Sequence, residues 1–223
     1  MDKPPKYLDR HPVLKDGISL VTFVAAVIIG TILLNAFVFR SYNVVGGSME
    51  NTLHSDDRII VNRVPVTLSH LFGQEYVPDR GQIIVFANGG NGDILTCEPT
   101  PGIRDQYVIK RVIAFPGEGV TVKDGILKVY NSEYPDGFSP DELTRTSDTD
   151  GPKIYSSSEV GTWDGNALIS PFTVPVGEVF VAGDNREGQH SLDSRNGLGT
   201  IPFCRIIGPA QIRIFPFDQL RIF

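Results

Sequence analysis

Residues 18–39 read ISLVTFVAAVIIGTILLNAFVF, an apolar run that contains no charged side chain. The charge-free stretch begins at Gly17, and it is long enough to cross a bilayer, which takes about 20 apolar residues. Few polar residues interrupt it, which disfavours a buried core helix. A cleaved secretory signal has a shorter apolar region followed by small residues, whereas this run ends in Phe39 and Arg40. We therefore predict an uncleaved transmembrane anchor over residues 17–39.

Basic residues flank this run unequally. Four Lys and Arg side chains lie within residues 1–16, whereas Arg40 is the only one that follows the run closely. Short flanks that are rich in Lys and Arg stay on the cytoplasmic side of a membrane. We predict a single-pass protein of the cell membrane, with residues 1–16 as a cytoplasmic tail and residues 40–223 outside the cytoplasm.

Beyond the anchor the hydrophobic pattern changes to short runs rich in β-branched and aromatic residues, which are typical of strands. These runs cover residues 58–61, 82–86, 107–115, 119–122, 126–130, 178–183 and 211–215. Between two of them, Asp124-Gly125 is the signal of a tight hairpin. We predict a mainly β fold, an all-β catalytic domain of antiparallel sheets that are closed or coiled so as to limit their edges.

Residues 131–170 are rich in Ser, Asp, Pro and Gly and show little periodicity. Such composition indicates a long surface insertion. We predict one short hairpin near Trp163 and assign the insertion no chemistry.

Charge and cysteine usage exclude several classes of partner. A net charge of −6 leaves no basic stripe for a phosphate backbone, so we expect no nucleic-acid partner. Cys97 and Cys204 lie far apart and form neither a CxxC nor a metal-ligand pattern, so we expect no metal and no cofactor. Two buried free thiols or a disulfide both fit this pair, and free thiols are the simpler interpretation.

Three further stretches carry residues with chemical potential. Gly46-Gly47-Ser48 follows the anchor closely, and a serine hydroxyl becomes a nucleophile when a base is at hand. Lys110 interrupts the apolar strand 107–115, where burial would lower its pKa and make it a base near neutral pH. Small, amide and charged residues then gather in 183–197, after a strand, which indicates a loop with its own hydrogen-bond network. Taken singly, each stretch is better explained as a loop, a turn or an edge-strand lysine.

Taken together and in order, these stretches resemble the sequence boxes of bacterial type I signal peptidases. The resemblance covers the anchor, the segments 48–53, 80–86 and 110–117, and the loop 183–195. It implies a membrane-bound serine endopeptidase in which Ser48 forms an acyl-enzyme and Lys110 is the general base. Ser191 would orient the lysine amine.

The resemblance also implies supporting residues and partners. Charge pairs that brace the site would come from Asp184, Arg111, Asp193 and Arg195. Shallow apolar subsites would be lined by Tyr42, Val44, Met49, Leu53, Ile59, Val85, Val108 and Ile109. The implied substrates are exported preproteins cut after an A-x-A-like sequence, and the lipid bilayer and the export machinery would lie nearby.

The sequence departs from the family pattern at a few positions. Gly46 lacks the hydroxyl that helps to form the oxyanion hole in some members, so the Ser48 N–H becomes the main candidate donor. The spacing between Arg186 and Ser191 is two residues longer than usual. Asn51, Gln82 and Glu118 replace a proline and two aspartates at turns.

Other functions are weighed against this one. His54 and His190 lie near motif serines, and histidine is the commoner base, but the position of the expected base is lysine. An anchored β-domain that only binds peptides would use similar grooves, yet it has no need for a buried lysine opposite a serine. A self-cleaving Ser-Lys repressor would need a DNA-binding helical segment in place of the apolar run.

Overall fold

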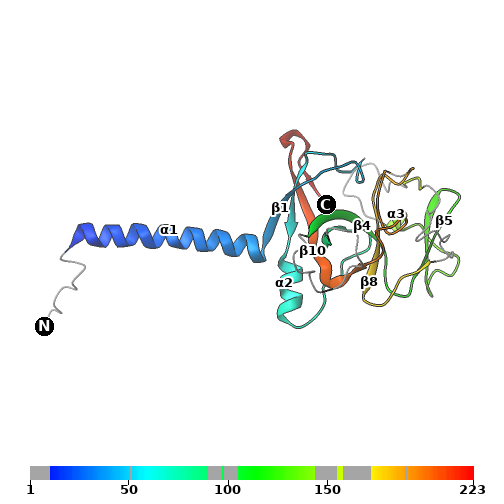
Figure 1. Cartoon of the computed structure of the whole chain (residues 1–223), viewed down its shortest axis with the longest axis horizontal. Coiled ribbons are helices and arrows are strands. Elements are labelled where there is room, and N and C mark those ends of the chain that lie inside the picture. The colour runs from blue at the N-terminus through cyan, green and yellow to red at the C-terminus, as the bar shows by residue number, and fades with distance from the viewer. Residues whose placement is uncertain are drawn as a thin grey trace.

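A computed structural model describes residues 11–50, 52–89, 97, 105–143, 155–157, 172–188 and 190–223. The helix α1 (Pro12–Phe37) projects away from the rest of the molecule (Figure 1). Its apolar span, Val13–Phe37, is long enough to cross a membrane and is not buried inside the protein. The helix ends before the predicted boundary at Phe39, because Phe39 already pairs with Asn62 as the first residue of a strand.

The end of α1 is fixed by a second helix that the sequence analysis did not predict, α2 (Val64–Leu71). The Arg63 guanidinium donates to the Ala36 carbonyl, and Thr67 Oγ1 donates to the Phe37 carbonyl at 3.0 Å. The last carbonyls of a helix have no partner within it. These two bonds therefore satisfy the end of α1 and dock α2 beside it, as Figure 1 shows.

The larger sheet has eight strands in the order β1-β2-β10-β3-β4-β8-β9, with β11 beside β10. Its strands are β1 (Phe39–Asn43), β2 (Arg58–Asn62), β3 (Ile83–Asn88), β4 (Gln106–Ala114), β8 (Glu178–Ala182), β9 (Ile201–Pro202), β10 (Ile206–Phe215) and β11 (Arg221–Ile222). All pairs are antiparallel, and the sheet is open, with β1 and β9 at its two ends.

The long strand β10 coils this sheet. Its first half pairs with β3 and its second half with β2, and the register shifts after Ile206. At Gly208, a Cβ would lie 2.3 Å from the Asn62 carbonyl oxygen, so a side chain cannot fit where the backbones come closest. The change of partner along one strand gives the coiled sheet that the sequence predicts.

A smaller sheet has the order β6-β5-β7. Its strands are β5 (Gly119–Lys123), β6 (Ile126–Tyr130) and β7 (Phe172–Thr173). Asp124 and Gly125 both have positive φ between β5 and β6, as a tight hairpin turn requires. The short helices are α3 (Pro140–Leu143) and the 3₁₀ turns η2 (Phe203–Arg205) and η3 (Phe217–Gln219).

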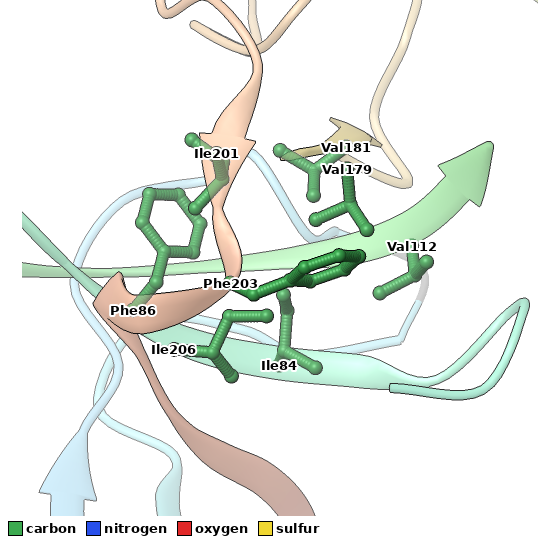
Figure 2. Packing of buried hydrophobic residues seen from close by; sticks show 8 residues of the cluster. All are labelled: Ile84, Phe86, Val112, Val179, Val181, Ile201, Phe203 and Ile206. Carbon is green, nitrogen blue, oxygen red and sulfur yellow. The ribbon is translucent and has the colours of Figure 1, made fainter. Parts of the chain in front are cut away.

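Three apolar clusters hold these sheets together. The first lies between β3, β4, β8 and the start of β10, and Figure 2 shows its members Ile84, Phe86, Val112, Val179, Val181, Ile201, Phe203 and Ile206. The second joins the loop after β1 to β2 and β3. The third packs the small sheet against β4 and β8. Lys110 lies on β4, the strand that contributes to all three clusters.

The predicted strands are confirmed as β2, β3, β4, β5, β6, β8 and β10. The last begins at Ile206, before the predicted start at residue 211, because Gly208 and Pro209 hid the strand pattern. Strand β1 was not predicted, since its polar Arg40, Ser41 and Asn43 follow directly on the apolar run.

Cys97 and Cys204 form a disulfide, so the free-thiol interpretation is wrong. The two cysteines lie 107 residues apart, and their pairing depends on the fold rather than on local spacing. The hairpin predicted near Trp163 lies outside the described residues.

Candidate active site

The nucleophile candidate and the base candidate meet although they are 62 residues apart. Ser48 lies on the loop that follows β1, and Lys110 lies near the middle of β4. Lys110 Nζ is 2.6 Å from Ser48 Oγ, which is hydrogen-bond distance. Ser48 is partly exposed, whereas Lys110 is only 4% exposed. Ser48 is therefore open to a substrate, whereas the Lys110 amine is kept away from water.

The surroundings of Lys110 favour its neutral form. Burial lowers the pKa of Lys110 to about 8, against the opposing negative charges of Asp193 and Asp184 and with help from Arg195. At pH 7, a lysine with a pKa of about 8 is neutral in about a tenth of molecules, compared with well under one in a thousand for a free lysine. The amine can therefore accept a proton from a neighbouring hydroxyl.

The loop of Ser48 is held from behind by the turn after β8. The Asn185 N–H donates to the Ser48 carbonyl at 3.1 Å, and Asn185 Nδ2 donates to the Gly47 carbonyl at 3.1 Å. At Gly183, an added Cβ would lie 2.2 Å from the Ser48 carbonyl oxygen and 2.3 Å from Ser191 Oγ. Three segments of chain therefore meet with no room for a side chain at residue 183.

Ser191 is buried at this meeting point in spite of the longer spacing before it. Its Oγ donates to Asp193 Oδ2 at 2.7 Å, and that oxygen also accepts from the Gly183 N–H. Within the part of the chain that the structure describes, the hydrogen bond of Lys110 Nζ goes to Ser48, not to Ser191. Ser191 thus lies beside the pair and is fixed by Asp193.

Two ion pairs support the loop. Arg195 binds Asp193 through Nε and Nη2, at 2.9 and 2.8 Å. Arg111 binds Asp184 through Nε and Nη2, at 2.7 and 2.5 Å, and Arg111 Nη1 donates to the Gly81 carbonyl. Burial alone would raise the pKa of Asp184, but the Arg111 guanidinium outweighs it and holds that pKa below its usual value.

Thr52 connects the Ser48 loop to the same carboxylate. Its Oγ1 donates to Asp184 Oδ2 at 2.5 Å. Arg213 adds a contact from β10, since its Nη1 donates to the Thr52 carbonyl and pairs with Asp57 at 3.1 Å. Nothing in the sequence marks Thr52, Arg213 or Asn185, because each is an ordinary polar residue until the fold brings it to the loop.

Most of the apolar residues predicted to line subsites share one cluster, which includes Met49, the residue next to Ser48. All except Val108 belong to the second cluster: Tyr42, Val44, Met49, Leu53, Ile59, Val85 and Ile109. Val108 packs against the first cluster instead, because neighbouring residues of a strand point to opposite faces. The hydroxyl of Tyr42 is buried without a hydrogen-bond partner among the described residues.

Several of the described residues in the predicted surface insertion are buried. Asp141, Tyr155 and Ser157 are buried, and Asp141 pairs with Arg186 in the turn beside the site. The polar composition of 131–170 hid this, because a buried ion pair and a solvated loop draw on the same residue types.

The alternative bases do not reach the serine. His54 and His190 are both exposed, and among the described residues the basic side chain on Ser48 Oγ is Lys110. His54 lines a pocket of about 290 Å³ together with Asp57, Phe215 and Gln219.

Comparisons with known proteins identify the family of the chain. A family model described as signal peptidase, peptidase S26, matches residues 17–215. Signal peptidase I of Bacillus licheniformis is 33% identical over 208 residues, which cover 91% of this chain and 92% of that protein. Signal peptidase I T of Bacillus subtilis (strain 168) is 33% identical over 190 residues, covering 85% of this chain and 81% of that protein.

A solved structure was also found. The crystal structure of a signal peptidase I from Enterococcus faecalis V583 has 26% sequence identity and a TM-score of 0.35, and it covers 60% of this chain and 96% of that one.

Proposed function

Because this chain belongs to the signal peptidase family, peptidase S26, and is therefore a serine endopeptidase, we propose that it acts through a Ser48 and Lys110 dyad. The contact of 2.6 Å between Lys110 Nζ and Ser48 Oγ is the observation that carries this proposal. Burial of the lysine supports it, because a base must be neutral before it accepts a proton.

In the proposed mechanism, neutral Lys110 takes the proton of Ser48 while Oγ bonds to the carbonyl carbon of the scissile peptide. The developing oxyanion accepts from the Ser48 backbone N–H. The lysine ammonium then gives its proton to the leaving amine, and the acyl-enzyme forms on Ser48. Lys110 then deprotonates a water, which attacks the ester. The bond to Ser48 Oγ breaks, Oγ takes its proton back from the lysine ammonium, and the free carboxyl end of the signal peptide is released. In this scheme Ser191 holds the Asp193 carboxylate, whose negative charge acts on the lysine amine.

The substrate is a preprotein with a signal peptide, and we infer that cleavage follows small residues in an A-x-A-like pattern. The apolar cluster beside Ser48 supports shallow subsites, because its residues are already packed against one another. Incubation with a synthetic preprotein, read by mass spectrometry, is expected to show one cut directly after the second Ala. Replacement of that Ala by Leu is expected to abolish the cut. Equal cleavage of both substrates, or cleavage elsewhere, would contradict the proposed specificity.

We further propose that α1 crosses the membrane with residues 1–16 in the cytoplasm and residues 40–223 outside, as the catalytic domain, near the export machinery. The disulfide supports this placement, since such bonds persist in oxidising compartments. Leu71 and Phe72, at the end of α2, are exposed apolar side chains. They support a membrane surface at this place, because α2 is docked at the end of α1.

Protease added to intact cells without outer layers tests this orientation. It is expected to digest the region after residue 40 and to leave a tag on the N-terminus protected. Digestion of the tag with protection of the catalytic domain would show the reverse orientation.

Gly183 gives a test of how tightly the site is assembled. Gly183→Ala is expected to lower kcat/KM by about 100-fold, because the added methyl must displace the Ser48 carbonyl or Ser191. Overpacking of this kind also destabilises by about 1–3 kcal/mol, which thermal unfolding would register. Gly89→Ala is the matched control, since a Cβ there meets nothing within 4 Å. Normal turnover by Gly183→Ala would show that the three segments are not held as tightly as the structure has them.

A further inference from the structure

The insertion reaches the active site through one buried acidic residue. Asp141, on α3, binds Arg186 through both oxygens, at 2.8 and 2.9 Å, and both side chains are 0% exposed. Arg186 lies in the turn after β8, where its Nε donates to the Gly183 carbonyl at 2.8 Å. The same turn carries Asn185, whose N–H holds the Ser48 carbonyl. A continuous chain of contacts therefore runs from the insertion to the Ser48 loop.

A second residue of the insertion makes an independent contact with this loop. The Tyr155 hydroxyl is 3.1 Å from Thr52 Oγ1, which in turn donates to Asp184. Its ring lies 5.1 Å from the Arg186 guanidinium and 5.8 Å from that of Arg111. The Tyr155 N–H also donates to Asp141 Oδ2 at 3.3 Å. Tyr155 thus packs between the two arginines and the loop of Ser48.

Asp141 also neutralises a buried positive charge near the site. Besides Arg213, which pairs with Asp57, three buried guanidiniums lie around the site, those of Arg111, Arg186 and Arg195. Three buried carboxylates pair with them, those of Asp184, Asp141 and Asp193. Without Asp141, the Arg186 guanidinium would be an uncompensated positive charge in the turn after β8, and such a charge in the interior is costly.

We propose that Asp141 and Tyr155, together termed the insertion clamp, are positioning residues that hold the Ser48 loop and the turn 183–186 in register with Lys110. This inference rests on the proposed function. The insertion clamp contacts Arg186 and Thr52, and through Arg186 it reaches the turn that carries Asn185. It therefore affects the chemical step more than substrate binding.

The test compares kcat and KM of two clamp variants with those of a control. Tyr155→Phe keeps the ring between the arginines and removes only the hydroxyl, and it is expected to lower kcat about tenfold with KM nearly unchanged. Asp141→Asn is expected to lower kcat about 100-fold. Glu142→Gln, which changes the exposed acidic neighbour of Asp141, is the matched control and is expected to behave as wild type.

The pH profile separates positioning from a merely structural role. Asp193, Asp184 and Arg195 are the charged groups that act on Lys110, and Asp141→Asn adds net positive charge to their network. The pH at which kcat/KM reaches half of its maximum is therefore expected to fall in Asp141→Asn and to stay unchanged in Tyr155→Phe. The double variant Asp141→Leu with Arg186→Met removes both charges of the ion pair, so its stability and its pH midpoint are expected to return to the wild-type values. Its kcat is expected to stay low, since residue 186 no longer holds the Gly183 carbonyl.

Wild-type kcat in folded Tyr155→Phe, or in the double variant, would overturn the proposal. If Asp141→Asn does not fold, Tyr155→Phe decides alone, because it leaves the ion pair intact. Ser48→Ala is measured alongside these variants. Cleavage by Ser48→Ala would contradict the proposed function itself, whereas an inactive Ser48→Ala with a fully active Tyr155→Phe would contradict the insertion clamp alone.

Discussion

Ser48→Ala is expected to lower kcat/KM for preprotein cleavage by about 10³-fold or more, because alanine has no oxygen to form the acyl bond. The variant should remain folded. Its one lost hydrogen bond leaves the Lys110 amine unpaired, at a cost of about 1–3 kcal/mol. That cost is below the 5–15 kcal/mol typical of a domain.

Ser41→Ala is the matched control, since Ser41 is an exposed serine on β1 a few residues before Ser48. It is expected to keep wild-type activity. Cleavage at a normal rate by Ser48→Ala, with circular dichroism showing an intact fold, would remove Ser48 from the mechanism.

Lys110→Arg is expected to cause a loss of similar size, about 10³-fold, although it keeps the positive charge. A guanidinium holds its proton at every working pH and cannot act as a base. The substitution separates the two roles that a lysine could have, since a residue needed only for its charge would tolerate arginine. Single-turnover kinetics with purified protein would measure the chemical step directly.

Lys128→Arg is the control for this substitution, because Lys128 is a partly buried strand lysine on β6. Both variants change lysine to arginine within a strand, but only one lies beside Ser48. Substantial turnover by Lys110→Arg would mean that another group accepts the proton of Ser48.

Most helices and strands of the fold can be predicted from the sequence, because each depends on the residue types within its own segment. The apolar run predicts α1, and β-branched runs predict the strands that form the cores. Asp124-Gly125 predicts the hairpin, since its two positive φ angles suit those residue types. The proximity of Ser48 and Lys110 follows from the family resemblance, not from any local pattern.

The rest depends on contacts between distant segments. Asp141 and Arg186 are separated by 45 residues, and neither carries a local sign that it will be buried. The disulfide depends in the same way on where the fold places Cys97 and Cys204. Helix α2 is short and rich in β-branched residues, and its place is set by the carbonyls at the end of α1 rather than by helix propensity.

The pH dependence of kcat/KM for the wild-type protein is the most direct test of the dyad. Only neutral Lys110 accepts a proton, and raising the pH removes its proton, so activity must rise with pH. Because burial lowers the pKa of Lys110 to about 8, kcat/KM is expected to rise about tenfold per pH unit below that value and to level off above it. A profile that is flat across this range, or one that levels off near the ordinary histidine pKa of about 6.5, would contradict the assignment of Lys110 as the base.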